Sequence, residues 1–142
     1  MIKVPQLFTS HWRNPDLRDL DAIIIGISRG TPGGNPGFRY RVLRSLAPSR
    51  ETFAIQDRER YAASYRAQLE ELGAGRILAD LKRIGGTGAI VMLCWERMAD
   101  PSEWCHRRML ARYIERETGL EVPELKAQML PQRVDEAQRS LF

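Results

Sequence analysis

Two runs of consecutive apolar residues dominate the hydrophobic pattern of the chain. Residues 22–27 read AIIIGI, and residues 89–94 read AIVMLC. Continuous runs of this length are typical of strands that are buried on both faces of a parallel sheet. A shorter apolar run from Gln6 to Ser10 predicts a strand ahead of them.

Apolar residues that recur three and four positions apart predict helices between and after these runs. Asp57–Leu72 is expected to form one helix, with tyrosines and leucines along its apolar face. A second helix is expected from Ile77 to Ile84, where Gly85 and Gly86 stop it.

A third helix is expected to begin at Asp100. That residue can cap the helix, with Pro101 in the first helical position and Glu103 completing a capping box. Gly119 is the expected C-terminal stop.

Strands and helices therefore alternate along the chain, which predicts an α/β fold. We expect a single domain with a mostly parallel sheet and helices on both faces, a Rossmann-like three-layer arrangement. Residues 1–126 are expected to form this domain and residues 127–142 a C-terminal tail. A length of 142 residues and a hydrophobic content of 43% suit one domain with a real core.

The chain contains no apolar run long enough to cross a bilayer, and the segment MIKVPQLFTS lacks the core of a signal peptide. We therefore expect a cytoplasmic protein whose two cysteines are reduced thiols. The net charge of +4 favours an anionic partner. Because all but three of the 22 basic residues are arginines, a GC-rich genome is an alternative explanation of the charge.

A loop is predicted for residues 28–40, SRGTPGGNPGFRY, since five of the six positions 32–37 are glycine or proline. Its backbone amides could cradle a phosphate, with Arg29, Arg39 and Arg41 adding positive charge. The loop matches neither the Walker pattern nor the dinucleotide fingerprint, so a plain turn-rich connection remains the alternative.

The residues with chemical potential follow the ends of the two predicted central strands. Cys94 closes one strand, Glu96 follows it, and Cys105, His106 and Arg107 lie near the start of the third helix. Ligands of parallel sheets bind at the carboxyl ends of strands, so these groups converge with Arg29 if the strands are neighbours. Cys105 could then be a nucleophile, because a helix N-terminus and adjacent cationic residues favour the thiolate.

Three alternatives to a thiol nucleophile remain. The stretch could be a packed strand–helix junction in which Arg107 pairs with Glu96. The second alternative is a metal site, which the spacing disfavours. Ten residues separate the cysteines, and Cys105 and His106 would diverge by about 100° on a helix. A Cys94–Cys105 redox pair would lack the short CxxC spacing of dithiol enzymes.

Two longer segments resemble signatures of the domain of unknown function 488 (DUF488) family. They are SRGTPGGNPGFRYRVLRSLAP and VMLCWERMADPSEWCHRRMLARYI, and the resemblance runs from about Gln6 to Val122. The matching positions are Ser28, Arg29, Gly30, Thr31, Pro32, Pro36, Gly37, Arg39, Tyr40, Cys94, Glu96, Cys105, His106 and Arg107. The resemblance implies an α/β fold and a site made from these residues, but no reaction.

The final five residues, QRSLF, resemble the pentapeptide by which many bacterial replication and repair proteins bind the sliding clamp. Leu141 and Phe142 would enter an apolar groove, and Gln138 would make polar contacts at its edge. Arg139 replaces the usual leucine. The alternative is a last helix that folds back on the domain core.

We therefore expect a DNA-associated bacterial or phage protein, and the leading hypothesis is an enzyme acting on a nucleotide or nucleic acid. Its catalytic group would be Cys105, Glu96, His106 and Cys94. The substrate's anionic group would be bound by Arg29, Thr31, Arg39, Tyr40 and Arg107. The alternatives are a non-catalytic adaptor that binds nucleic acid or another anion, and a metal-binding protein that uses Cys94, Cys105 and a histidine. The sequence identifies no cofactor.

Overall fold

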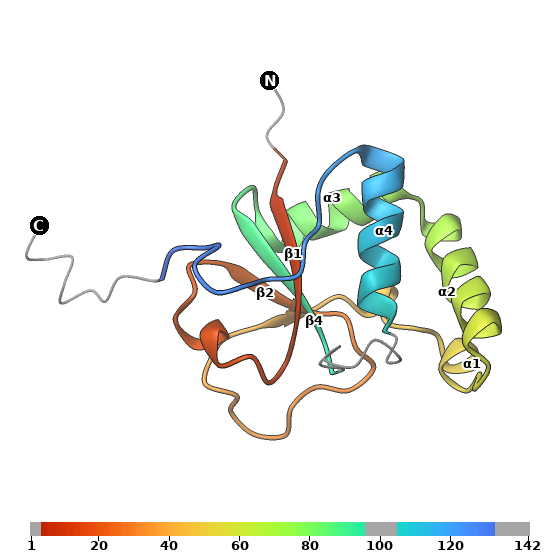
Figure 1. Ribbon diagram of the computed structural model, residues 1–142, viewed down its shortest axis with the longest axis horizontal. Helices are drawn as coiled ribbons and strands as arrows, with labels where there is room; N and C mark the ends of the chain where they lie inside the picture. Colours follow the sequence, from red (N-terminus) through yellow and green to blue (C-terminus); the bar gives the residue numbers. More distant parts are fainter. Residues whose placement is uncertain (1–3, 96–104, 133–142) are drawn as a thin grey trace, which may run out of the picture.

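The computed structural model describes residues 4–95 and 105–132, and a parallel sheet lies at its centre (Figure 1). The strands are β1 (Gln6–His11), β2 (Ile23–Gly26), β3 (Arg41–Val42) and β4 (Ala89–Cys94). Their order in the sheet is β1-β4-β2-β3, and every pairing is parallel. The expected α/β class, parallel sheet and single domain are confirmed.

The side chains of the central strands alternate between two buried faces. Ile25 of β2 pairs in register with Met92 of β4, and both pack on the helical side. Ile24 and Val91, one position earlier, pack on the opposite side. Beyond the exposed Ile23 that begins β2, neither strand has a solvent-facing side, so both form continuous apolar runs.

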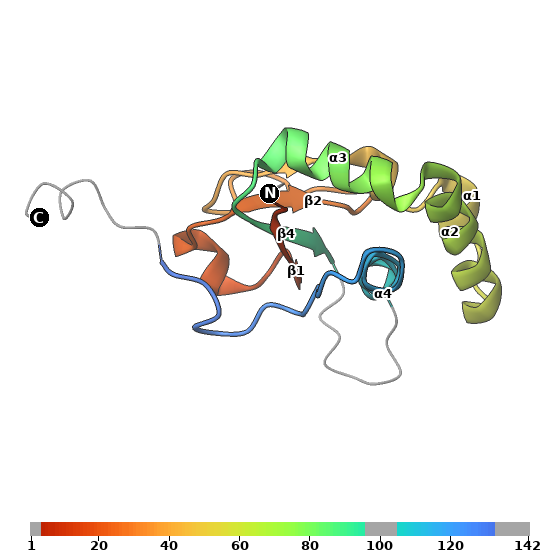
Figure 2. The ribbon, with the colours of Figure 1, turned by 90° about the horizontal axis from the view of Figure 1, so that it is seen from above.

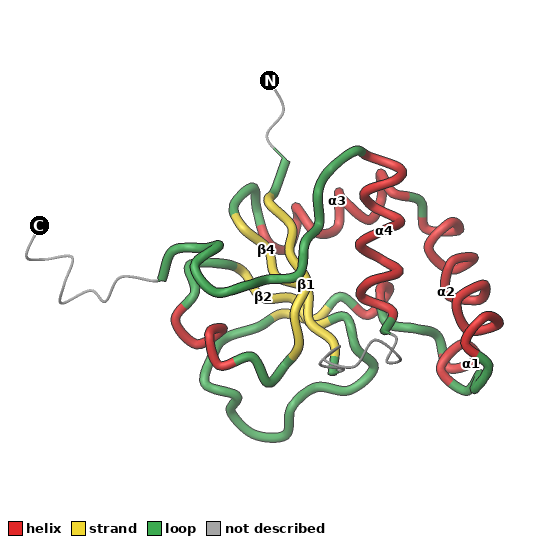
Figure 3. Tube along the Cα trace, in the orientation of Figure 1, coloured by secondary structure: helices red, strands yellow, loops and turns green. Residues whose placement is uncertain are grey.

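The two faces of the sheet are covered differently. On one side lie α2 (Arg58–Leu72), α3 (Ala74–Gly85) and α4 (His106–Thr118), as Figure 2 shows. The other side is covered by the short 3-10 helix η1 (Pro15–Asp19) and by the chain after α4, drawn as loop in Figure 3. The α-helices of the described residues thus form one layer, and the second layer is mostly extended chain.

The first two predicted helices form as expected. The Asp57 carboxylate caps α2 by accepting a hydrogen bond from the Arg60 amide at 2.9 Å. Gly73 ends this helix with φ +83°, a backbone conformation that favours glycine. Two short elements that lack any visible periodicity precede α2, namely η2 (Arg44–Leu46) and α1 (Arg50–Phe53).

The third predicted helix begins later than expected. Helix α4 starts at His106, and its N-cap is Cys105 rather than Asp100. The expected capping residues Asp100, Pro101 and Glu103 lie outside the described residues. The C-terminal stop is confirmed, since Gly119 follows α4 in the left-handed conformation with φ +78°.

The chain after α4 returns to the sheet at the edge strand β1. The Thr9 amide donates to the Pro123 carbonyl at 3.0 Å, and the Leu125 amide donates to the Thr9 carbonyl at 2.7 Å. Further on, Leu130 is buried on the second face. The boundary at residue 126 stays a prediction, because residues 133–142 lie outside the described part. No described helix is long and apolar enough to cross a membrane.

Trp12 covers the end of β2 on the second face. Its ring occupies the space that a side chain at Gly26 would need, with a Cβ there only 2.5 Å from Cζ2. Its Nε1 donates to Ser28 Oγ at 2.9 Å, and Ser28 Oγ donates to the Gly30 carbonyl at 2.6 Å. Trp95 donates to the same carbonyl at 3.0 Å. The two indoles thereby fix the turn that follows β2.

Candidate functional site

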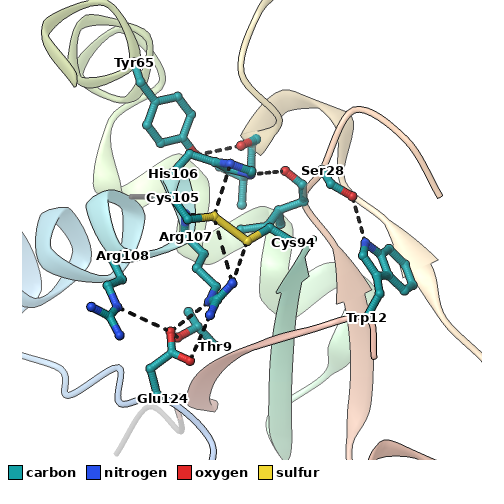
Figure 4. The surroundings of a disulfide bond; sticks show 12 residues. Thr9, Trp12, Ser28, Tyr65, Cys94, Cys105, His106, Arg107, Arg108 and Glu124 are labelled. Carbon is teal, nitrogen blue, oxygen red and sulfur yellow. Dashed lines mark hydrogen bonds and ion pairs between the residues drawn. A yellow bond between two sulfur atoms is a disulfide. The ribbon is translucent and has the colours of Figure 1, made fainter. Parts of the chain in front are cut away.

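The end of β4 and the start of α4 bring four of the predicted residues together, as Figure 4 shows. Cys94 is the last residue of β4, Cys105 is the N-cap of α4, and His106 and Arg107 open that helix. All four side chains are buried, with exposed fractions of 4% or less. This cluster lies at the carboxyl ends of β4 and β2, the edge at which parallel sheets bind ligands.

The two cysteines are joined through their Sγ atoms as a disulfide. The expectation of two reduced thiols is therefore wrong for this state of the protein. The N-cap geometry explains the meeting, because Cys105 has extended backbone angles, φ −144° and ψ 144°. Its sulfur accepts a hydrogen bond from the Arg107 amide at 3.5 Å and lies against the end of β4.

The cap position also brings Cys105 and His106 together. The expected divergence of about 100° applies only when both residues lie inside a helix. Because Cys105 lies before the first turn, its Sγ is 3.7 Å from His106 Nδ1. The predicted divergence of Cys105 and His106 is therefore wrong, and their adjacent positions do not exclude a shared site.

Hydrogen bonding fixes the protonation pattern of His106. Nε2 lies 2.6 Å from the Ile27 carbonyl at the end of β2. A carbonyl oxygen only accepts, so Nε2 carries the hydrogen, and in the neutral ring Nδ1 presents its lone pair toward Cys105. The ring of Tyr65 packs edge-to-face on the imidazole, with 5.4 Å between centroids. Burial raises the pKa of Tyr65 well above its ordinary value, so its hydroxyl stays protonated and donates to the Leu46 carbonyl at 2.6 Å.

We expect the stability of the protein to fall as His106 is forced to ionise. Burial lowers the pKa of His106 to about 4, against the opposing effect of the bond to Ile27, and the Arg107 charge adds to the lowering. The pKa of this histidine is about 6.5 in the unfolded chain and about 4 in the folded protein. Between these two pH values the unfolded chain binds more protons, so the free energy of unfolding decreases as pH falls from about 6.5 to about 4.

The expected loss from this residue is roughly 2 kcal/mol between about pH 7 and about pH 4.5. Urea unfolding at both pH values, with a chelator present, measures it. The His106→Gln variant should lose less stability over the same interval. Equal losses in both proteins would contradict the assignment.

Arg107 is fully buried and bonded to two kinds of acceptor. Its Nη1 donates to Cys94 Sγ at 2.8 Å, and its Nε donates to Glu124 Oε1 at 2.8 Å. Its Nη2 donates to the second carboxylate oxygen at 3.3 Å, and Thr9 donates to Oε1 at 2.9 Å. The guanidinium thus links the sulfur pair to a carboxylate that the sequence reasoning did not select. No motif pointed to Glu124, which follows α4 in a stretch without periodicity.

Four of the five residues expected to bind an anion line two separate hollows, and the fifth, Arg107, is buried in the cysteine cluster instead. Arg29 and Thr31 line a cavity of about 390 Å³, which also contains Arg44, Ser49 and Gln68 in its wall. Arg39 and Tyr40 instead line a hollow on the other side of β2, about 300 Å³ in volume. They do not join the first cavity.

The remaining predicted site residues are Arg29, which has a defined position, and four others that do not. Arg29 is held by a bond from Nη1 to the Pro48 carbonyl at 3.1 Å, and its guanidinium lies over the Phe53 ring. Glu96 and the tail residues Gln138, Leu141 and Phe142 lie outside the described residues.

The sulfur cluster has the composition of a metal-ligand set, although the sequence predicted no metal. One ligand atom each from Cys94, Cys105 and His106 lies within 4.8 Å of the other two. Both thiol sulfur and imidazole nitrogen are ligands of Zn²⁺ and related cations. In the disulfide form the sulfurs are bonded to each other, so ligation requires their reduction.

Comparison with known proteins gives a family but no relative of known activity. The family described as "Domain of unknown function DUF488" matches residues 33–114, more than half of the chain. No curated protein and no solved structure matches the chain. The match begins at Gly33, inside the glycine-rich loop, and extends through α2, α3 and β4 into α4. It therefore includes the cysteine cluster but neither Arg29 nor Thr31. The chain belongs to the DUF488 family.

Proposed function

We propose that the protein is a cytoplasmic enzyme that uses Cys105 on a phosphate-bearing substrate, a nucleotide or a nucleic acid. The observation that carries the proposal is the pairing of Cys105 Sγ with the lone pair of His106 Nδ1 at 3.7 Å. In the reduced protein, neutral His106 can accept the thiol proton at Nδ1 as the sulfur attacks, so a nucleophilic thiolate forms in that step. The N-terminus of α4, whose Arg107 amide already points at this sulfur, stabilises that anion.

Reduction of the disulfide precedes this chemistry. A cellular dithiol breaks the Sγ–Sγ bond by exchange, supplies two electrons and two protons, and becomes a disulfide itself. Cys94 and Cys105 are then thiols. Arg107, which donates to Cys94 Sγ, stabilises the neighbouring sulfur rather than binding substrate.

The cavity beside the end of β2 supports a phosphate-bearing substrate. Arg29 and Arg44 are both exposed and line it, and neither forms an ion pair with a described carboxylate. Arginine binds phosphate through paired N–H donors, and the hydroxyl of Thr31 can add a further donor. Ser28, in the cavity wall, directly follows Ile27, whose carbonyl accepts the hydrogen bond from His106 Nε2. The cavity therefore adjoins the cysteine cluster.

Phosphate binding is tested with the reduced protein and a labelled nucleoside triphosphate or single-stranded oligonucleotide. The Arg29→Ala/Arg44→Ala double variant should bind at least about tenfold more weakly. Arg66→Ala/Arg76→Ala is the matched control, because it removes the same charge from exposed helix positions. If both variants lose the same binding affinity, the loss comes from the lower net charge, and the proposed cavity site is contradicted.

Thiol chemistry is tested by turnover of such substrates with and without a reductant. Activity should require the reductant and disappear in Cys105→Ser, which leaves substrate binding within about twofold. Binding without turnover in the wild type would instead support a non-catalytic adaptor.

We also propose that the segment QRSLF recruits the protein to DNA by binding a bacterial sliding clamp. The residue types support this role, because leucine and phenylalanine suit an apolar groove and glutamine its polar edge. The purified chain should bind clamp, and both Leu141→Ala/Phe142→Ala and a chain ending at Ala137 should lose that binding. Equal binding by all three proteins, or by none, would contradict recruitment by this route.

A further inference from the structure

We propose that the reduced protein binds a thiophilic divalent cation, of which Zn²⁺ is the model, through Cys94, Cys105 and His106. This site goes beyond the proposed enzyme activity and does not depend on it. Ligation would turn Cys105 from a nucleophile into a ligand, so the cation would also control that activity.

The spacing of the donor atoms fits a tetrahedral ion. Zn–S bonds of about 2.3 Å and Zn–N bonds of about 2.0 Å place neighbouring sulfur and nitrogen ligands about 3.5 Å apart. The distance from Cys105 Sγ to His106 Nδ1 is 3.7 Å. These two donors therefore already stand where one edge of the tetrahedron requires them.

The two cysteines have the backbone spacing for a shared ion. Their Cα atoms are 7.7 Å apart, whereas disulfide-bonded residues usually keep theirs within roughly 4.4–6.8 Å. After reduction, the sulfurs need to lie about 3.8 Å apart around a tetrahedral ion. The backbone leaves room for that separation without a change in β4 or α4.

The groups around the donors match the outer shell of a metal site. A ligating histidine commonly donates its other ring N–H to a carbonyl or carboxylate, which fixes the ring and its tautomer. Here His106 Nε2 donates to the Ile27 carbonyl, so Nδ1 is the ring nitrogen with its lone pair directed at the sulfurs.

Charge is balanced as well. Two thiolates neutralise a divalent cation, and the Arg107 guanidinium that donates to Cys94 Sγ is neutralised by Glu124. The buried cluster would therefore carry no net charge with the ion bound. That balance matters because an uncompensated charge inside a protein is costly.

Binding is gated by the state of the sulfurs. A phosphine reductant breaks the disulfide, the sulfurs gain two electrons and two protons, and the phosphine becomes its oxide with oxygen from water. Each thiol then releases its proton to solvent as the cation binds. The disulfide and the metal site exclude one another. Exchange with a small-molecule disulfide, which takes up two electrons and leaves as two thiols, would re-form the Cys94–Cys105 bond and expel the ion.

Cobalt(II) titration of the full-length reduced protein tests the site, because Co²⁺ is a coloured substitute for Zn²⁺. One ion per chain should bind, with thiolate-to-cobalt charge-transfer absorption in the near ultraviolet and intense visible bands of tetrahedral geometry. Zn²⁺ should displace Co²⁺ and abolish both signals. The oxidised protein should show neither signal until the phosphine is added.

Variants separate this site from adventitious binding. Cys94→Ser and Cys105→Ser should each lose the charge-transfer bands, and His106→Gln should weaken binding at least about tenfold. Arg29→Ala, in the neighbouring cavity, is the control and should bind as the wild type does. Circular dichroism reports whether each variant folds.

The wild-type measurement alone can overturn the proposal. Reduced wild-type protein that binds no Co²⁺, or binds it without charge-transfer absorption, has no such site. The Arg29→Ala/Arg44→Ala variant should lose substrate turnover and still give the wild-type Co²⁺ spectrum. Failure of the enzyme proposal and failure of the metal proposal are therefore distinguishable.

Discussion

Replacing Trp12 with alanine is expected to lower the free energy of unfolding by about 4 kcal/mol. The indole is 4% exposed and lies at the centre of the second-face core. It packs edge-on against Tyr40 with 4.9 Å between centroids and is tilted against Trp95 at 5.9 Å. Gly26 has no Cβ to fill the space that the ring would leave, so a large cavity results.

Urea unfolding of the oxidised protein at neutral pH measures this loss. Trp12→Phe is the matched control: it keeps an aromatic ring but loses the bond to Ser28, and we expect it to cost about 1–2 kcal/mol. An alanine variant no less stable than the phenylalanine variant would show that the ring contributes little to this face.

Replacing Glu124 with leucine is expected to cost about 3 kcal/mol of stability. The carboxylate accepts hydrogen bonds from Nε and Nη2 of Arg107 and from the Thr9 hydroxyl. The Arg107 guanidinium is fully buried. Removing one member of such a pair leaves a buried charge with poorer compensation. Because Glu124 itself is 30% exposed, the expected cost lies at the lower end of the range for buried pairs.

A double-mutant cycle tests whether the loss comes from the pair. Arg107→Met/Glu124→Leu should be more stable than Glu124→Leu alone, since it also removes the buried charge. Glu70→Leu is the control, because its ion pair with Arg66 is more than half exposed and should contribute less than about 0.5 kcal/mol. Additive costs at residues 107 and 124 would contradict a coupled pair.

The strands and two of the helices could be predicted because their signals are local. Residues 24–27 and 90–94 are buried on both faces, and α2 and α3 carry regular apolar faces that end at glycines. In contrast, β3 spans only Arg41–Val42, too few residues to form a pattern. Its place at the sheet edge is set by pairing with β2.

The site was predictable in its residues but not in its geometry. The spacing of Cys94 and Cys105 could not show that Cys105 caps α4, because Asp100 also satisfies the rules for a cap. That one difference changes Cys105 and His106 from divergent neighbours into a pair 3.7 Å apart. Glu124 reaches Arg107 only because the chain returns to β1 after α4, and no local pattern encodes that return.

The return of the chain to β1 also bears on self-association. β1 is an edge strand, and an uncovered edge offers its amides and carbonyls to strands of other molecules. Residues 123–125 occupy both backbone groups of Thr9 and so block part of that edge. A fragment ending after α4 would keep the residues that match the family and yet expose this edge. Such a fragment should associate edge to edge and aggregate, whereas a chain extending through Leu125 should stay dispersed.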